Sequence, residues 1–245
     1  MIAPRRQSHT LAARYRDCLL GDLGGLILLV AQAPFIGWLC VVVWGSIESD
    51  TPALYFVLCL AAVWFGCVNA CREIVKERAI LERERLFGLR PGAYVLSKIW
   101  VLAALGAVQV VLLQGTVEWS LQLRGPMALE LLALFGASVV GTGLGLLISA
   151  LATTQERAVF AVPILLLPQI LFSELAIPDN LYSDVVAAVE KMMPVHWAFR
   201  VFEESAALEP RWHLVALFLI ILLAMAATLV AATTVALIPR REVVT

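Results

Sequence analysis

Residues 72–94 read REIVKERAILERERLFGLRPGAY, a dense mixture of charges in an otherwise apolar chain. The stretch holds six basic and four acidic residues, whereas charged residues make up 15% of the 245-residue chain and hydrophobic residues 61%. A soluble domain usually carries about 25% charged residues. Long apolar runs flank the stretch on both sides, so the composition places the chain among membrane proteins.

Outward from this stretch, six apolar runs are long enough to cross a bilayer, since about 20 helical residues cover a hydrocarbon core of about 30 Å. We expect these spans at about 23–44, 53–71, 99–117, 128–151, 158–177 and 213–238. Backbone groups in lipid must be hydrogen-bonded within the segment, which favours helices over the alternating strands of a barrel. The predicted fold is therefore an all-α membrane protein with six transmembrane helices.

The run between the fifth and sixth spans, 185–202, is apolar but short. It contains Glu190, Lys191, Pro194 and Arg200. These residues make a full crossing unfavourable, because charged side chains in hydrocarbon are costly. A re-entrant or interfacial hairpin fits this run better.

The distribution of Lys and Arg orients the predicted bundle. Fourteen of these residues lie in the two termini, the 72–98 stretch and the connection between the fourth and fifth spans, and four lie on the opposite side. Such an excess marks the cytoplasmic side, so both termini are predicted to be cytoplasmic. The tail before the first span is too long and polar for a cleaved signal peptide, and we expect that span to be retained.

The charged stretch itself has the composition of a helix. Residues 72–87 lack Gly and Pro and are rich in helix formers, and Arg78 and Glu82 pair at helical spacing. We expect a cytoplasmic helix over about 72–88 that continues from the second span, breaks at Gly88 and re-enters the membrane at Tyr94. Lys98 should extend to the membrane surface. The pattern fits a helix docked on another protein and a helix lying on the membrane surface equally well.

Several segments, in the same order and spacing, resemble the type-2 ABC exporter permeases and most closely their G subfamily of half-transporters. IVKERAILERERLFGL (74–89), followed by Tyr94 and Ser97-Lys98, resembles the connection between that family's second and third spans. LAARYRDC (11–18) resembles its amphipathic connecting helix, LLLPQILFSELAIP (165–178) its fifth span and outer turn, and PVHWA (194–198) its re-entrant segment. The resemblance implies a cytoplasmic connecting helix over 1–22 and a six-span permease domain over 23–245, with an outer hairpin at about 178–204.

The resemblance also implies partners. Two permease copies, identical or closely related, would form an export pathway in a cell membrane, most typically a bacterial one. Each copy would dock on an ATP-binding subunit through a coupling helix over about 72–88. The chain has no G-x-x-x-x-G-K-[ST] phosphate loop, so we expect ATP and Mg²⁺ on a separate chain and no cofactor on this one. The residues matching the family's coupling positions are Glu77, Arg78, Glu84, Arg85, Gly88 and Tyr94.

The match in the second and fifth spans implies a set of pathway residues, which comprises Phe65, Asn69, Leu167, Ile170 and Leu175. The face of Phe65 could stack on flat or apolar substrates. Alternatively, Phe65 is an ordinary packing residue, and the amide of Asn69 bonds a neighbouring helix. In the fourth span, small residues that include Gly141 and Gly145 recur every four positions and permit close helix approach, within the subunit or between copies.

One position departs from the family pattern. Glu174 stands at the outer end of the fifth span, where the family usually has Gly. Its carboxylate would either attract cationic substrates at the exit or face water.

Two other functions agree less well with the sequence. A non-transporting membrane scaffold would also have six spans, but it does not account for the charged helix. An intramembrane enzyme would need catalytic groups, yet the three histidines are scattered and neither H-E-x-x-H nor G-x-S-x-G occurs. We therefore expect no catalytic residue. The five cysteines suggest neither a disulfide framework nor a metal site, and a net charge of −1 does not suggest nucleic acid. Membrane lipid is the expected surrounding.

Overall fold

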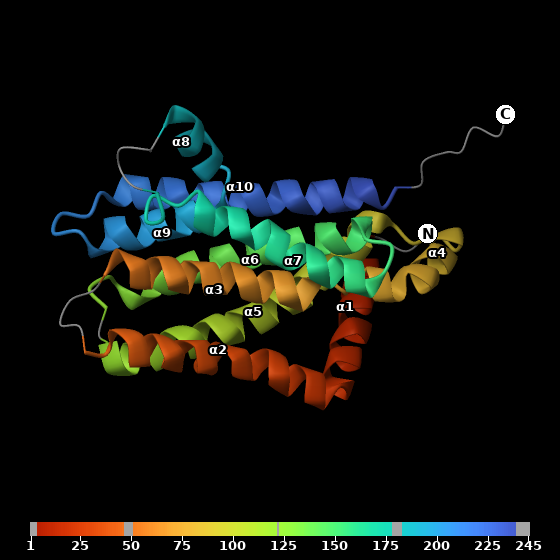
Figure 1. Ribbon diagram of the computed structural model, residues 1–245. Coiled ribbons are helices and arrows are strands. Elements are labelled where there is room, and N and C mark those ends of the chain that lie inside the picture. The colour runs from red at the N-terminus through yellow and green to blue at the C-terminus, as the bar shows by residue number, and fades with distance from the viewer. Residues whose placement is uncertain (1–3, 47–50, 122, 178–182, 239–245) are drawn as a thin grey trace.

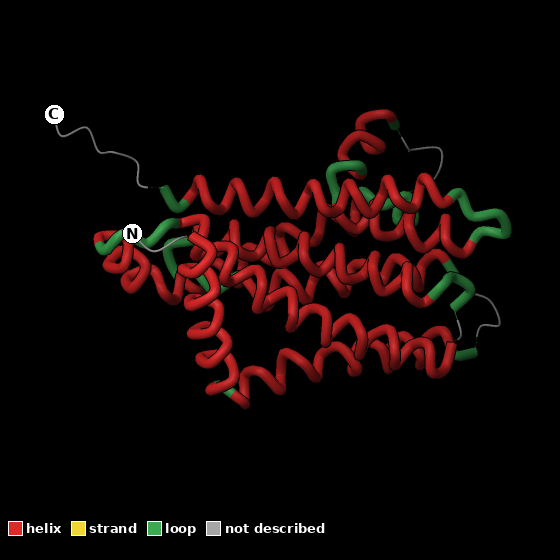
Figure 2. The backbone as a smooth tube through the Cα atoms, turned by 180° about the vertical axis from the view of Figure 1, so that it is seen from behind, coloured by secondary structure: helices red, strands yellow, loops and turns green. Residues whose placement is uncertain are grey.

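The computed structural model describes residues 4–46, 51–121, 123–177 and 183–238. It is 84% helix, with no strand in these ranges. The helices are α1 (Pro4–Gly21), α2 (Leu23–Trp44), α3 (Pro52–Ala70), the 3-10 helix η1 (Val75–Glu77), α4 (Arg78–Leu86), α5 (Pro91–Leu121), α6 (Met127–Leu151), α7 (Gln155–Leu171), α8 (Asp184–Glu190), α9 (Pro194–Ala206) and α10 (Trp212–Ala236). The long helices form an elongated bundle, and α1 lies across its axis near the end that carries α4 (Figures 1 and 2).

Five helices in the described part of the chain are long and apolar enough to cross a membrane: α2, the helix that starts at Pro52, α5, α6 and α10. They correspond to five of the six predicted spans, although α5 starts at Pro91 rather than at 99. The expected fifth span, 158–177, is represented by α7, which has 17 residues and ends at Leu171. Pro163 and Pro168 lie inside α7, and each lacks the N–H of a regular helical bond.

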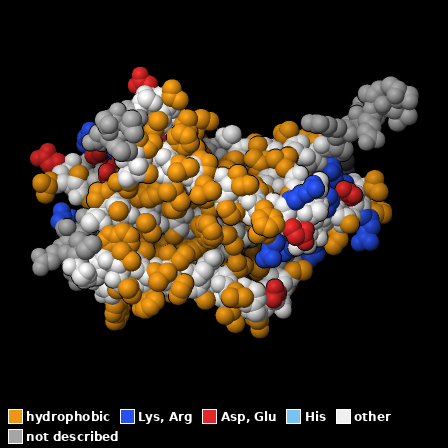
Figure 3. Space-filling model, viewed as in Figure 1, with side chains coloured by type: hydrophobic (Ala, Val, Ile, Leu, Met, Phe, Trp, Pro, Cys, Tyr) orange, Lys and Arg blue, Asp and Glu red, His pale blue; other side chains and the backbone are white. Residues whose placement is uncertain are grey.

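The surface agrees with helices that cross a membrane. Hydrophobic side chains cover the middle of the face seen in Figure 3, and charged side chains gather toward the two ends of the bundle. Leu28 is 75% exposed, Trp100 67% and Ile220 59%. Apolar surface of this extent is unfavourable in water and normal in contact with lipid.

Glycines bring α3 and α6 into close contact at the centre of the bundle. A Cβ atom on Gly66 would lie 2.1 Å from the Ser138 carbonyl oxygen, and one on Gly141 would lie 2.3 Å from the Val63 oxygen. On Gly145 it would lie 2.6 Å from the Cys67 oxygen. The small residues of the fourth span thus face α3 within one chain.

Buried amides join three spans. Asn69 Nδ2 on α3 donates to Gln109 Oε1 on α5 at 2.6 Å, and Gln109 Nε2 donates to the Leu29 carbonyl oxygen on α2 at 2.6 Å. A polar side chain among spans needs such a partner, because an unpaired amide in an apolar medium is costly. These bonds position α2 and α5 against α3.

The segment between α7 and α10 forms two short helices. Residues 178–182 of the predicted outer hairpin lie outside the described residues. α9 is firmly packed: Phe199 is 2% exposed, and Phe202 is fully buried with its ring 5.2 Å from that of Tyr55 on α3.

Candidate coupling site at the charged end

The predicted continuous helix over 72–88 is interrupted. α3 ends at Ala70, and helical structure resumes only with η1 and α4. The N–H groups of Ile74 and Val75 donate to Ser149 Oγ on α6, at 2.9 and 3.0 Å. Hydrogen bonds to a neighbouring helix thus replace bonds along the chain, and Ile74 is completely buried in the resulting turn. Arg78 adds a second anchor, since its Nη2 donates to the Ala150 carbonyl oxygen at 2.6 Å.

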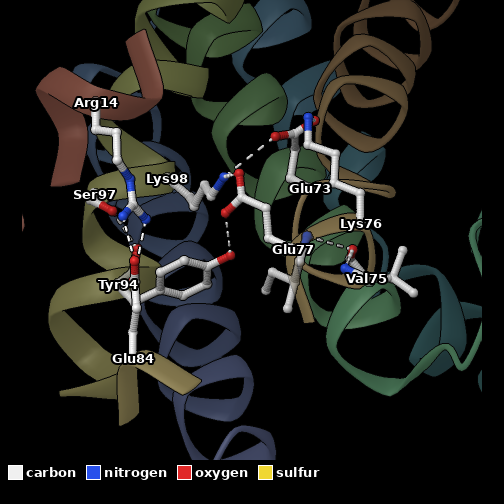
Figure 4. A network of polar contacts seen from close by, with 11 residues as sticks. Arg14, Glu73, Val75, Lys76, Glu77, Glu84, Tyr94, Ser97 and Lys98 are labelled. Carbon is white, nitrogen blue, oxygen red and sulfur yellow. Dashed lines mark hydrogen bonds and ion pairs between the residues drawn. The ribbon is translucent and has the colours of Figure 1, made fainter. Parts of the chain in front are cut away.

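An ion cluster links this turn to the first turns of α5 (Figure 4). Lys98 Nζ lies 2.8 Å from Glu77 Oε1 and 3.6 Å from Glu73 Oε2. Tyr94, one helical turn before Lys98, donates its hydroxyl hydrogen to Glu77 Oε2 at 2.9 Å. Lys76 lies 2.5 Å from Glu73. The cluster therefore holds η1 and α5 together through opposite charges.

Lys98 is buried, so the prediction that it extends to the membrane surface is wrong. It is 1% exposed, and its ammonium lies 3.6 Å from the ring centroid of Tyr15 on α1, a cation–π contact. Burial and the neighbouring carboxylate of Glu73 raise the pKa of Tyr15, so its hydroxyl stays protonated at neutral pH. α1 packs over the cluster and excludes the water that an extended Lys98 side chain would contact.

α1 is also fastened to α4 and to the turn that follows it. Arg14 Nη1 lies 2.5 Å from Glu84 Oε1. Gln7 Nε2 donates to the Gly88 carbonyl oxygen at 3.4 Å, and Gln7 Oε1 accepts from the N–H of Arg90 at 3.3 Å. Gly88 has φ +90°, a conformation that favours glycine and ends the charged segment.

Part of α4 and of the turn after it is exposed. Leu86 and Phe87 are 86% and 87% exposed, although both are apolar. Ile80 is 44% exposed on the same short helix, whereas Leu81 is buried and holds α4 on the bundle. Arg85 is partly buried, with Nη2 enclosed and without a hydrogen-bond partner. The tip of this segment thus presents an apolar surface to its surroundings.

Among the predicted coupling residues, the structure brings Glu77 and Tyr94 into the ion cluster and directs Arg78 to α6. Glu84 contacts α1. Glu73, Lys98, Tyr15 and Ser149 were missed as members of this site. Lys98 follows Tyr94 by one turn at the start of an apolar run, which was a signal for this residue. Tyr15 lies in the LAARYRDC segment and Glu73 in the charged stretch, but only tertiary packing brings them and Ser149 to the site.

The predicted pathway residues fall into two groups. Phe65 is fully buried and Asn69 is 5% exposed, so neither faces a surface of this chain, and their place on a pathway stays a prediction. Leu167, Ile170 and Leu175 are 54%, 39% and 43% exposed on and just after α7. They are free to contact lipid, cargo or a second copy.

A family model and a known protein match this chain. A family model described as ABC-2 type transporter matches residues 7–206. The chain is also similar to the ABC transporter ATP-binding/permease protein Rv1747 of Mycobacterium tuberculosis (strain ATCC 25618 / H37Rv), with 29% identity over 194 residues. That match covers 71% of this chain and 22% of the relative, so the chain spans about a fifth of the relative's length.

Proposed function

Because this chain belongs to the ABC-2 type transporter family, we propose that it is the permease subunit of an ATP-driven exporter that works with an ATP-binding subunit on a separate chain. Domains of this family are membrane transport domains and not themselves ATPases. The name of the relative, which joins ATP binding and permease, supports a partnership of these two activities. In the proposed assembly, two permease copies form the pathway in the cell membrane, and the partner holds ATP and Mg²⁺.

The proposed layout has six spans, with α7 as the fifth. α7 lies alongside the other long helices in Figure 1 and contacts α3 and α6, which supports this role despite its length. The excess of Lys and Arg supports a cytoplasmic location for α1, α4 and both termini. α1 then serves as the connecting helix, η1 and α4 as the coupling helix, and α8 and α9 as the outer hairpin.

Leu86 and Phe87 carry the proposal. Figure 1 shows α4 at the extreme end of the bundle, beyond α1 and the long helices. Two large apolar side chains exposed at such a position indicate a protein contact, because water disfavours them and the spans lie away from them. The surrounding charges of α4 would form the polar rim of that contact.

The route from this contact to the spans runs through the ion cluster. Force applied at α4 reaches α5 through Glu77 and Lys98, and it reaches α6 through Arg78 and Ser149. α3 is connected by the chain itself. Closure of the ATP-binding subunits can therefore move three spans as rigid bodies, which is the requirement for alternating access.

Replacing Phe87 by Ser tests the contact. In proteoliposomes that contain the permease and its ATP-binding subunit, we expect the affinity of the two to fall about tenfold or more, the loss typical of a central interface residue. Permease-dependent ATP hydrolysis should fall with it. The matched control is Leu208→Ser, since Leu208 is also fully exposed but lies between α9 and α10. Equal affinity and hydrolysis in both variants and the unchanged protein would contradict the proposal.

Leu167, Ile170 and Leu175 are proposed to face the pathway or the second copy. Their exposure on and just after α7 supports this. Phe65 and Asn69 belong to the interior of one subunit in the present conformation.

A further inference from the structure

The end of α7 that points away from α4 is held in an unusual way. Along α7 only a narrow stripe is buried: Ala158, Val162, Leu166 and Gln169. The helix ends at Leu171, and Glu174 follows in the turn. Apolar packing therefore contributes little to holding this end of α7, and polar contacts contribute more.

Arg200 on α9 is the centre of these polar contacts. Its Nη2 lies 2.6 Å from Glu174 Oε2, and its Nη1 lies 2.7 Å from Glu203 Oε2. The three side chains are 27–35% exposed, so water screens the charges only in part. Glu174 thus neither attracts cations freely nor simply faces water.

A second set of contacts extends the arrangement to α8. The N–H of Glu174 donates to Glu190 Oε1 at 3.1 Å, and the same oxygen lies 3.3 Å from His196 Nδ1 on α9. Glu190 is 4% exposed and His196 is 8% exposed. Backbone and side chain of Glu174 are therefore both held, one by α8 and the other by α9.

The two partners of the central ion pair differ in how firmly they are anchored. α9 is fixed by Phe199 and Phe202, which are buried against α3. In the described part of the turn after α7, residues 172–177, no apolar side chain is fully buried, and Leu175 is 43% exposed. Breaking the pair would therefore leave the end of α7 held only by the backbone bond of Glu174 to Glu190, while α9 stays in place.

We propose that Glu174 and Arg200 form an ionic latch that holds the outer end of α7 against α9 and opens when the pathway opens outward. The inference rests on the proposed function in one respect, namely that α7 lines the pathway. Both residues are positioning residues, because they act through the placement of α7 and not through contact with cargo. A fixed surface ion pair with no role in gating would leave export unchanged when removed.

A distance measurement tests the latch independently of transport. Spin labels are attached at Leu171→Cys and Leu208→Cys in a Cys18→Ser background, because Cys18 is the exposed cysteine and the other four are buried. The full chain is reconstituted with its ATP-binding subunit and with excess unlabelled permease that carries the same substitution, so that distances within one copy are measured. The variants are Glu174→Gln, Arg200→Gln and the double variant.

We expect each single variant to increase the population of longer distances about fivefold or more, at the lower end of usual coupling between sites. The double variant should add nothing further, because either change already removes the pair. The matched control is Arg211→Gln, which removes another paired arginine nearby, 2.8 Å from Glu204. Unchanged distances in the single variants, or an equal shift in the control, would overturn the latch.

Export by the same preparations separates the two proposals. If the unchanged protein exports and the single variants alter both the distances and the export rate, the latch is supported. Normal distances and normal export in the variants overturn the latch and leave the proposed function intact. Absence of ATP-dependent export by the unchanged protein contradicts the proposed function. If the distances in the variants still shift in that case, the Glu174–Arg200 pair has a structural role without a role in gating. That result also overturns the latch.

Discussion

At the scale of single residues, the charged end depends on Lys98. A buried ammonium is unfavourable unless opposite charges and hydrogen bonds compensate for the lost water. Glu77, Glu73 and the ring of Tyr15 provide that compensation. The sequence places Lys98 near a membrane boundary, where an extended lysine is the usual expectation. Its burial could not be predicted, because Tyr15 belongs to α1 and reaches Lys98 only through tertiary packing.

Removal of this charge should destabilise the fold. Lys98→Met leaves two carboxylates facing each other in a buried site, and we expect a loss of about 3–5 kcal/mol in the free energy of unfolding. Lys76→Met is the matched control: the Lys76 side chain is 37% exposed and pairs with Glu73. That change should cost about 1 kcal/mol or less. Thermal unfolding in detergent measures both, and similar losses would show that the cluster is not centred on Lys98.

At the scale of elements, the length of an apolar run predicts well that a helix forms. It predicts less well the residues at which the helix begins and ends. α2 spans the expected 23–44, and the Asp22 side chain caps its start by accepting from the Gly25 N–H. α3 was expected to continue into the charged segment, but Ser149 draws the N–H groups of Ile74 and Val75 away from it. α7 ends early, after its two prolines. Bonds to residues far along the chain are not visible in a local pattern.

The contact between α3 and α6 gives an element-scale prediction. Gly141→Ala places a Cβ within 2.3 Å of a backbone oxygen of α3, so the helices must separate. We expect a loss of about 1–3 kcal/mol, the usual cost of overpacking. Gly115→Ala on α5 is the control, since its Cβ would have no atom within 4 Å, and it should leave stability unchanged or raise it. Thermal unfolding distinguishes the two, and a stable Gly141→Ala variant would contradict the close packing.

At the scale of the whole molecule, the two ends of the bundle have different proposed roles. One end carries an apolar tip supported by buried charges, and the other carries an ion pair between α7 and α9. The sequence predicted the polarity of the bundle and the position of the charged segment. It could not show that Leu86 and Phe87 are left uncovered or that Glu174 is paired, because both depend on which surfaces the other helices occupy.

The central claim is that the tip of α4 contacts an ATP-binding subunit. The most direct measurement replaces Phe87 by the photocrosslinking residue p-benzoylphenylalanine and irradiates native membranes, with the same replacement of Leu208 as control. The account predicts an adduct between position 87 and the ATP-binding subunit and none from position 208. Adducts of position 87 with lipid alone, or the same protein adducts from both positions, would contradict it.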